Sequence, residues 1–281
     1  MHGPAYQGKA VRRRYDRSVQ RRHFLTALAA GTLGALTSCS VGDPVPLAVH
    51  SSAPPPPPKP AGVGLLPPDV ASRTPLPAEP ITGLPGRGRH LALTVDDGAS
   101  SEVVGAYIKF AKDTGARFTF FVTGSFDSWR DNRDQLRPLV ESGQIQLGNH
   151  TWTHADLTSL SSSGVADELK QCKEFLRKEF GVDGTPFYRP PYGYRNEGVD
   201  AVAADLGYLA PTLWYGSLSD SGLITEQYLL RCAREYFHPQ TVIIGHANHP
   251  PVTHTYPQLV EIIKNRRLRM VTLNDYFLPH R

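Results

Sequence analysis

The chain has 281 residues, a formal net charge of +4 and 25 prolines. Its length allows one large domain or two small ones. Residues 1–38 carry seven of the 30 Lys and Arg residues but one of the 26 Asp and Glu residues, so the remainder has 23 basic and 25 acidic side chains. The positive charge therefore belongs to the N-terminal segment, and we expect no nucleic-acid partner for the rest of the chain.

The N-terminal segment is typical of an export signal. Residues 12–22 are basic, residues 20–25 read QRRHFL, which is similar to a twin-arginine signal, and residues 24–36 are apolar and small. The apolar run is too short to favour a membrane span. The alternative is an ordinary export signal with additional arginines. Either signal predicts that the protein leaves the cytoplasm.

A cysteine follows the apolar run directly. The sequence LTSC, Leu36 to Cys39, resembles a bacterial lipobox, in which the cysteine is lipidated and becomes the mature N-terminus. We therefore expect residues 1–38 to be a signal peptide and Cys39 to anchor the protein at the outer face of the cell membrane. The alternative is a small-residue cleavage site with an incidental cysteine, which would yield a secreted protein.

A proline-rich stretch follows the expected anchor. Fourteen of the 25 prolines lie between Pro44 and Pro85, and five of them are consecutive from residue 54 to residue 58. Such a tract favours extended polyproline II and has little apolar surface to bury. We expect residues 39–87 to be a disordered spacer and residues 88–281 to form one domain with a substantial core, as a monomer.

Short β-rich runs alternate with helical patterns from residue 90 onward. The strand-like runs are Leu91–Val95, Arg117–Val122, Ile145–Leu147, Pro186–Arg189, Tyr208–Trp214, Thr241–Ile244 and Leu268–Leu273. Helical patterns cover residues 103–111, 164–180, 225–236 and 256–264. Seven strands that alternate with helices predict an α/β fold with a parallel sheet. Closure into a barrel does not follow from this pattern alone.

Polar side chains follow five of these strands. The motifs after them are, in chain order, DDG, NHTWTH, RPPYG, LWYGSLSD and GHANH. In α/β folds functional residues collect beyond the carboxyl ends of the parallel strands. The sequence therefore predicts one site at that edge of the sheet.

Two histidines and an aspartate doublet point to a metal. His150 and His154 are four residues apart, so a helical turn would place both imidazoles on one face. With one carboxylate they suit Zn²⁺ or a similar divalent ion. Of Asp96 and Asp97, which point in different directions at a strand end, one could bind the ion and the other take a proton from an activated water. The alternative is a turn with two solvated carboxylates.

The motifs match those of a known family in kind and order. Residues 90–277 resemble a polysaccharide deacetylase domain of carbohydrate esterase family 4, also called the NodB-homology domain, whose five motifs correspond to TVDDG, HTWTH, RPPYG, W…D and IGH. The resemblance implies a distorted (β/α) barrel with about seven parallel strands. It also implies hydrolysis of an N-acetyl amide, or sometimes an O-acetyl ester, on a sugar polymer, with one divalent metal ion, expected to be Zn²⁺.

The resemblance assigns roles to the residues at the first three motifs. Asp96 would be the general base, and Arg189 would hold it ionised and aimed, since a nearby cation lowers a carboxylate pKa. Asp97 would join His150 and His154 as metal ligands.

The other matching residues would act on the reaction's later steps and on the substrate. The backbone N–H of Tyr192 would hold the oxyanion of the tetrahedral intermediate. His246, paired with Asp220, would protonate the leaving amine. Pro191, Tyr192 and Trp214 are expected to contact the substrate.

Two positions depart from the family pattern. Asp220 is followed by Ser221 where the family usually has Trp, so a pocket-wall aromatic is absent or is supplied by Trp214 or Tyr215. Ile244 stands where the last motif usually has Leu, which is a mild change. The base, the acid and the three ligands are intact, which argues against an inactive enzyme.

Three functions are compatible with the sequence. The first is a metal-dependent deacetylase tethered outside the membrane, with peptidoglycan as the natural substrate and chitin-like oligomers and acetyl-xylan next. The second is a sugar-binding lipoprotein that has kept the fold and lost turnover. The third is a hydrolase of a small non-sugar amide.

Two cysteines lie within the expected domain. Cys172 and Cys232 both fall in helical patterns, and export would permit a disulfide between them. We expect two separate buried thiols instead.

Overall fold

The computed structural model describes residues 64–69 and 73–278. The expected signal peptide, Cys39 and residues 39–63 of the expected spacer lie outside the described residues. The strands are β1 (Thr74–Pro75), β2 (His90–Asp97), β3 (Phe118–Val122), β4 (Ile145–Asn149), β5 (Phe187–Tyr188), β6 (Ala210–Pro211), β7 (Gly216–Ser217), β8 (Thr241–His246), β9 (Arg269–Met270) and β10 (Phe277–Leu278). The α-helices are α1 (Ser101–Thr114), α2 (Ser128–Asp131), α3 (Arg133–Glu141), α4 (Ser162–Phe180), α5 (Glu197–Asp205), α6 (Glu226–Tyr236), α7 (Tyr256–Asn265) and α8 (Leu273–Tyr276). Three 3₁₀ turns are η1 (Leu157–Ser159), η2 (Pro191–Gly193) and η3 (Pro250–His254).

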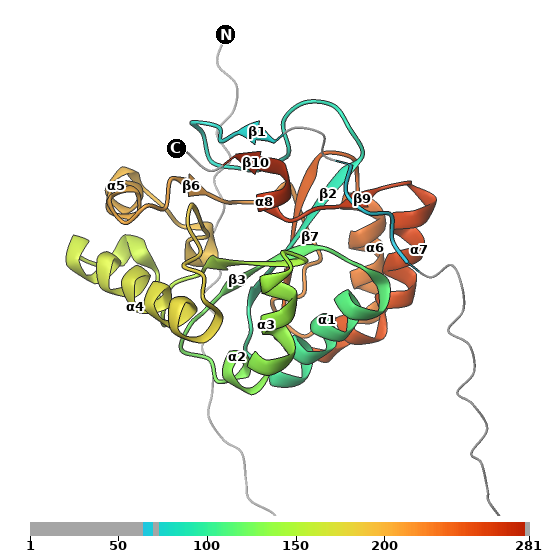
Figure 1. Ribbon diagram of the computed structural model, residues 1–281, viewed down its shortest axis with the longest axis horizontal. Helices are drawn as coiled ribbons and strands as arrows, with labels where there is room; N and C mark the ends of the chain where they lie inside the picture. Colours follow the sequence, from blue (N-terminus) through green and yellow to red (C-terminus); the bar gives the residue numbers. More distant parts are fainter. Residues whose placement is uncertain (1–63, 70–72, 279–281) are drawn as a thin grey trace, which may run out of the picture. The chain divides into compact units, whose positions relative to one another are not determined.

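A parallel sheet forms the centre of the fold. Its strand order is β6-β5-β4-β3-β2-β8-β7, and β9 pairs with the first residues of β2. All of these pairs are parallel. The sheet curls into a half-barrel with helices around it, among which α4 packs beside α5 and α6 beside α7 (Figure 1). The predicted α/β fold with about seven parallel strands is confirmed, and the sheet has eight strands when β9 is counted.

The central strands are buried along their whole length. Every residue of β2 and β3 is buried, as expected for parallel strands that are covered on both faces. Because side chains alternate along a strand, Leu91, Leu93 and Val95 join the large core under the helices, whereas Ala92 joins a smaller core on the other face. Asp96 has the same parity as Ala92 and therefore points to the inner face of the curled sheet.

Local sequence signals define the helix ends. Ser100 accepts a hydrogen bond from the Val103 N–H at the start of α1, and Ser161 caps α4 in the same way. Both helices end at a glycine with a positive φ, Gly115 (75°) and Gly181 (74°). The observed α4 agrees with the predicted 164–180 to within two residues, whereas α1 extends beyond the predicted 103–111 at both ends.

Some elements were not predicted. The strand β7 has two residues, and the helix α3 contains Pro138 near its middle, so neither carries an ordinary propensity signal. The helix α5 was also missed, and β6 is shorter than the expected strand at residues 208–214. The smaller elements depend on tertiary contacts more than on local sequence.

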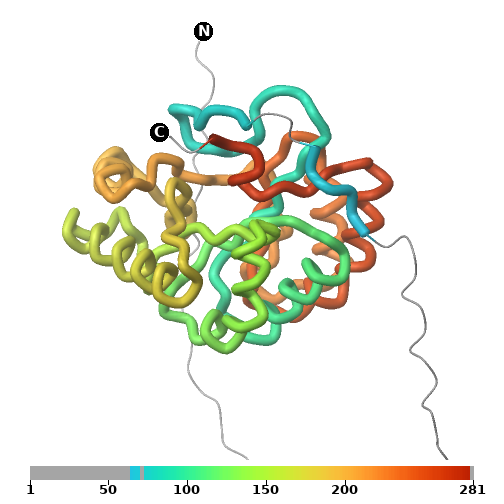
Figure 2. The backbone as a smooth tube through the Cα atoms, viewed as in Figure 1, coloured from blue at the N-terminus to red at the C-terminus, as the bar shows by residue number. Residues whose placement is uncertain are grey.

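Part of the expected spacer belongs to the folded unit. Leu76, Ile81 and Leu84 are buried in the smaller core, and β1 pairs with β10. Ile81 forms a bridge with Thr212 and Gly83 one with Thr241, so this segment connects the β6 end of the sheet to the start of β8. Figure 2 shows this early segment beside the C-terminal one. The folded unit therefore begins before residue 88, because apolar side chains between the prolines reach the core.

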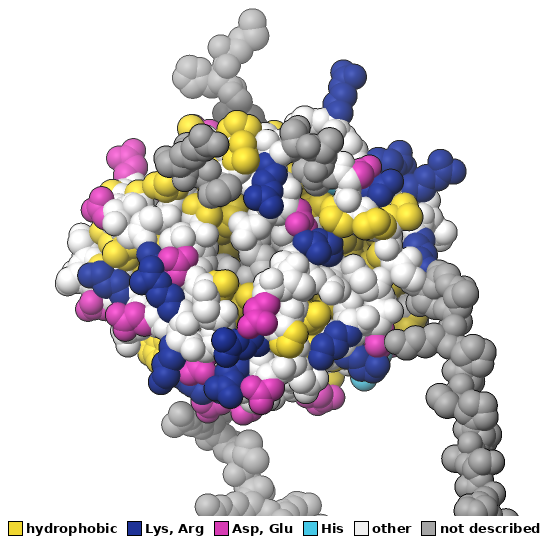
Figure 3. Space-filling view, in the orientation of Figure 1, with side chains coloured by type: hydrophobic (Ala, Val, Ile, Leu, Met, Phe, Trp, Pro, Cys, Tyr) yellow, Lys and Arg dark blue, Asp and Glu magenta, His cyan; other side chains and the backbone are white. Residues whose placement is uncertain are grey.

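The surface carries charges of both signs, as the nearly balanced composition after residue 38 predicts. On the face shown in Figure 3, Lys and Arg side chains are interspersed with Asp and Glu.

Cys172 and Cys232 are buried and form no disulfide, as expected, and burial raises the pKa of the Cys172 thiol to about 12. None of the helices in the described residues has the length and apolar character needed to cross a bilayer.

We predict that Ile81→Ala destabilises the domain by about 2–4 kcal/mol, since a large aliphatic side chain that is 1% exposed leaves a cavity when truncated. The measurement is the free energy of unfolding in urea. Leu66→Ala, at a side chain that is 53% exposed, serves as the control and should change stability little. Equal stability of the Ile81 variant and the wild type would show that this segment is a detached spacer.

Candidate metal and catalytic site

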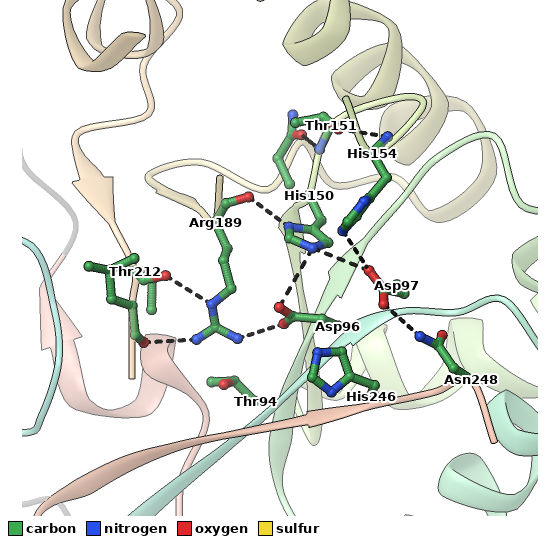
Figure 4. A network of polar contacts seen from close by, with 12 residues as sticks. Thr94, Asp96, Asp97, His150, Thr151, His154, Arg189, Thr212, His246 and Asn248 are labelled. Carbon is green, nitrogen blue, oxygen red and sulfur yellow. Dashed lines mark hydrogen bonds and ion pairs between the residues drawn. The ribbon is translucent and has the colours of Figure 1, made fainter. Parts of the chain in front are cut away.

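The predicted site residues meet at the carboxyl ends of neighbouring strands (Figure 4). Asp96 is in register with His246 of β8, and Asp97 with Val122 of β3. Val122 is in turn in register with Asn149, the residue before His150. The sheet register therefore gathers motifs that are up to 150 residues apart in the sequence.

The two aspartates of the doublet have different main partners, although both approach His150, whose Nε2 lies 3.6 Å from Asp96 Oδ2. Asp96 is 2% exposed, and its Oδ1 accepts a hydrogen bond of 2.5 Å from Arg189 Nη1. Asp97 has a φ of 72°, and its Oδ1 lies 3.3 Å from His150 Nε2 and 3.2 Å from His154 Nε2. The left-handed backbone at Asp97 turns its carboxylate away from Arg189 and toward the imidazoles.

The expectation of a helical turn between the histidines is wrong. Residues 150–156 form no helix, and Thr151 and His154 have positive φ values of 72° and 63°. The Thr151 hydroxyl accepts a hydrogen bond from the His154 N–H, and Glu168 accepts hydrogen bonds from the Trp152 and Thr153 N–H groups. This loop brings the two imidazole centroids to 4.9 Å without helical geometry.

The donor set fits a divalent metal ion. Ligand atoms of Asp97, His150 and His154 all lie within 4.8 Å of one another. His150 Nδ1 is 2.7 Å from the Arg189 carbonyl oxygen, so Nδ1–H donates there and Nε2 presents its lone pair to the site. Among the described residues, no group donates a well-formed hydrogen bond to the buried Asp97 Oδ1. One carboxylate and two imidazoles, with open positions, suit Zn²⁺.

Asn248 is a site residue that the sequence did not single out. Its Nδ2 donates a 2.7 Å hydrogen bond to Asp97 Oδ2, and its Oδ1 accepts a hydrogen bond of 3.2 Å from the Ala99 N–H. The second bond fixes which way the amide points. Asn248 therefore occupies one oxygen of Asp97 and leaves the other to face the histidines. Its place in GHANH, two residues after His246, was the available signal.

The charges of the site are strongly coupled. Burial alone would raise the pKa of Asp97, but the contacts from His150, His154 and Asn248 outweigh it and hold that pKa well below its usual range. Burial alone would lower the pKa of His150, and the negative charges of Asp96 and Asp97 raise it instead. A bound cation would take over this compensation of the negative charge.

Arg189 is fully buried, and its guanidinium donates three hydrogen bonds. Besides Asp96, it donates to the carbonyl oxygens of Thr212 (2.9 Å) and Leu213 (3.0 Å). Its guanidinium lies 4.3 Å from the centroid of the Phe121 ring. Burial lowers the pKa of Arg189, and Asp96 opposes that shift.

His246 is paired with Asp220, an aspartate outside the doublet. Its Nδ1 lies 3.0 Å from Asp220 Oδ1, which leaves Nε2 free to face the site. Burial alone would lower the pKa of His246, but Asp220 and then Asp96 raise it above its ordinary value. The imidazole is therefore suited to carry a proton near neutral pH.

These groups line a cavity of about 430 Å³. Its lining includes Tyr192, Trp214 and Ser221 together with both aspartates of the doublet, His150, His154 and His246. Pro190 contributes to the wall, whereas the expected substrate contact Pro191 is buried beside it. Trp214 thus supplies an aromatic wall near the position where Ser221 replaces the family's usual Trp. Asp220 lies behind the wall.

Strained backbone is concentrated at this site. Five of the seven non-glycine residues with positive φ in the described part of the chain are Asp97, Thr151, His154, Tyr192 and Ser219. Each such conformation costs about 1–3 kcal/mol and persists because the surrounding structure enforces it. Strain of this kind is typical of functional sites.

Comparison with known proteins identifies the domain. Residues 84–211 match the family model described as polysaccharide deacetylase. This match and the deacetylase relatives support a polysaccharide deacetylase domain of carbohydrate esterase family 4 in this chain. A chitin deacetylase of Arthroderma benhamiae is 28% identical over 198 residues, which cover 66% of this chain and 51% of that protein. The peptidoglycan-N-acetylglucosamine deacetylase PgdA of Listeria monocytogenes is 26% identical over 194 residues, covering 67% of this chain and 39% of that protein.

A solved structure shares the fold of the deacetylase domain. A carbohydrate esterase family 4 pseudoenzyme from Bacillus anthracis superposes with a TM-score of 0.63 at 19% identity, covering 72% of each chain. This likeness concerns the fold alone. Because the fold occurs in a pseudoenzyme, turnover has to be argued from the site residues.

We predict that Asn248→Leu weakens metal binding to the deacetylase domain about 10–100-fold, the usual effect of removing a residue that orients a metal ligand. Without its donor, Asp97 Oδ2 loses its partner and the carboxylate can rotate. The measurement is a Zn²⁺ titration in competition with a chromophoric chelator. The neighbouring variant His249→Ala should bind as the wild type does, and unchanged affinity in Asn248→Leu would exclude this positioning role.

Proposed function

We propose that the chain is a metal-dependent hydrolase that removes acetyl groups from N-acetylated sugars of a polysaccharide. The observation that carries the proposal is that one cavity is lined by a metal-binding triad, a separate buried carboxylate and a histidine paired with an aspartate. Those are the parts that amide hydrolysis needs: an activated water, a general base and a general acid.

Asp97, His150 and His154 would hold the ion, for which Zn²⁺ is the best candidate. When bound, a divalent ion there supplies Lewis-acid polarisation of the acetyl carbonyl and lowers the pKa of water. The His150 Nδ1–H bond to the Arg189 carbonyl keeps Nε2 available for this purpose.

Asp96 is the proposed general base. Its Oδ1 is engaged by Arg189, so Oδ2 is the oxygen that would accept the proton of the attacking water. The hydrogen bond from Arg189 restricts the rotation of this carboxylate. The different partners of Asp96 and Asp97 allow the adjacent carboxylates to act separately.

Tyr192 and His246, which also line the cavity, would handle the developing negative charge and the proton of the leaving group. As the carbonyl oxygen becomes an oxyanion, the Tyr192 backbone N–H would donate to it. His246 Nε2 would then give its proton to the departing amine, while Asp220 holds Nδ1–H and stabilises the imidazolium. Carbon–nitrogen bond cleavage would leave acetate and a free amino sugar.

Aromatic side chains at the cavity support a sugar substrate. Tyr192 is 59% exposed and its ring lies 4.7 Å from that of His154, while Tyr194 is 56% exposed and 5.7 Å from Tyr192. Exposed rings of this kind can pack against the apolar faces of pyranose rings. Peptidoglycan and chitin are named as substrates in relatives, and both are favoured here over acetyl-xylan.

Two other functions stay as alternatives. A glycan-binding lipoprotein without turnover is disfavoured because Asp96, His246 and the three ligands are all present in one cavity. A hydrolase of a small non-sugar amide is disfavoured by the open aromatic wall at Tyr192 and Tyr194.

Acetate release tests the proposal directly. The protein would be incubated with peptidoglycan, chitin oligomers and acetyl-xylan, with Zn²⁺ and after removal of metal by a chelator. Metal-dependent release from at least one N-acetylated polymer is expected. Release from none of them would reject the proposed activity in favour of one of the two alternatives.

The aspartate doublet gives a sharper prediction. Asp97→Asn removes a charged ligand, so metal affinity should fall and added metal should restore part of the activity. Asp96→Asn keeps the metal but cannot accept a proton, so turnover should fall by about 10²–10⁴-fold, without rescue by excess metal. Metal content and acetate release are measured for both across a metal titration. Metal loss in Asp96→Asn with retention in Asp97→Asn would reverse the two roles.

We also propose that Cys39 anchors the protein at the outer face of the cell membrane, on the strength of the LTSC sequence; this residue lies outside the described part of the chain. Cys39→Ala should release the protein from the membrane fraction or leave its precursor uncleaved, as seen by cell fractionation and immunoblotting. Equal membrane association of variant and wild type would reject the lipid anchor.

A further inference from the structure

A group of unpaired polar atoms lies behind the proposed catalytic histidine. In the described part of the chain, five buried side-chain oxygens have no hydrogen-bond partner in the protein. Three of the five are the hydroxyls of Tyr107 and Tyr256 and the Oδ2 of Asp220. The other oxygen of Asp220 contacts His246. None of the proposed catalytic steps uses the two tyrosines.

The three oxygens come from separate elements around β8. Tyr107 lies on α1 and is 0% exposed, Tyr256 begins α7, and their ring centroids are 5.4 Å apart. A Cβ placed on Gly245 of β8 would be 3.3 Å from the Tyr107 hydroxyl and 3.5 Å from Asp220 Oδ2. Both oxygens therefore lie next to Gly245, where a larger side chain would crowd them and Leu218, whose Cδ1 would be 3.1 Å from the added Cβ.

The chemistry of the three groups is complementary to one water molecule. Both tyrosine hydroxyls can donate, and the carboxylate oxygen only accepts. A water that accepts from both hydroxyls and donates to Asp220 Oδ2 would satisfy all three atoms. Buried waters in proteins make about three such hydrogen bonds.

The electrostatics keep the tyrosines protonated. Burial raises the pKa of Tyr107 and Tyr256 well above the ordinary value, and the negative charge of Asp220 raises both further. Both hydroxyls thus remain donors throughout the neutral range. Leaving two buried donors and a charged acceptor unpaired side by side would cost free energy in the folded state.

We propose that a single buried water molecule bridges Tyr107, Tyr256 and Asp220 Oδ2 and thereby fixes the carboxylate that holds His246. The two oxygens of Asp220 would then have separate hydrogen-bond partners: Oδ2 the water and Oδ1 the imidazole of His246. Tyr107 and Tyr256 become positioning residues for the general acid. This last consequence, unlike the water site itself, rests on the proposed function.

A high-resolution crystal structure tests the site directly. An ordered water is expected within about 2.5–3.2 Å of all three oxygens. Absence of water density there, including the case in which Tyr107 bonds Asp220 directly, overturns the proposal.

Thermal stability gives a second test, because the expected effect of Tyr107→Phe on Tm depends on whether the water is present. With the water bound, Tyr107→Phe removes one of its partners, and Tm should fall by roughly 2–4 °C for a domain of this size. In a dry site the same change removes an unpaired hydroxyl, and Tm should stay or rise, which also overturns the proposal. Tyr276→Phe is the matched control, because that hydroxyl already accepts a 2.8 Å hydrogen bond from Gln240 and its loss should lower Tm in either case.

Kinetics test the positioning role. Tyr107→Phe should lower kcat roughly 3- to 10-fold, the worth of about one hydrogen bond, while KM and metal content stay as in the wild type. An unchanged kcat overturns the positioning role and leaves the water site to the crystallographic test. If the wild type itself releases no acetate, the proposed function fails, but the density and the Tm shift still decide the water site.

Discussion

The buried ion pair between Arg189 and Asp96 is the interaction on which the site depends. Two charges removed from water are stable only when the geometry is good and the remaining donors are satisfied. Arg189 meets this condition through the Thr212 and Leu213 carbonyl oxygens. Loss of either partner would leave an uncompensated buried charge, at a cost of about 3–5 kcal/mol. The pair is therefore a structural requirement as well as a proposed catalytic one.

The same arginine connects the proposed base to the proposed metal ligands. Its side chain donates to Asp96, while its backbone carbonyl accepts from His150 Nδ1 and so orients the nitrogen that is proposed to bind metal. Asn248 gives Asp97 a comparable support from the loop after β8. With Arg189 on one aspartate and Asn248 with the histidines on the other, adjacent like charges are separated into two environments. This separation explains how two adjacent carboxylates can be accommodated at the end of one strand.

The sequence predicted the central strands and the residues that gather at their carboxyl ends, because both leave local signals. Buried parallel strands are continuous apolar runs, and the motifs DDG and NHTWTH follow their ends. The contacts that aim these residues could not be predicted. Asn248 meets Asp97 across two strands, and the left-handed backbone at His154 replaces a helix that spacing alone favoured. The burial of Ile81 could not be predicted for a similar reason, because the proline-rich composition around it does not show that its side chain contacts a core formed by distant residues.

The separation of the two aspartates can be seen directly by crystallography of the protein loaded with Zn²⁺, with anomalous scattering data collected at the zinc edge. We expect one anomalous peak about 2.0–2.2 Å from Asp97 Oδ1, His150 Nε2 and His154 Nε2, with Asp96 still bonded to Arg189 and outside the coordination sphere. A peak coordinated by Asp96, or one that leaves Asp97 unbound, would mean that the doublet does not divide its roles in this way.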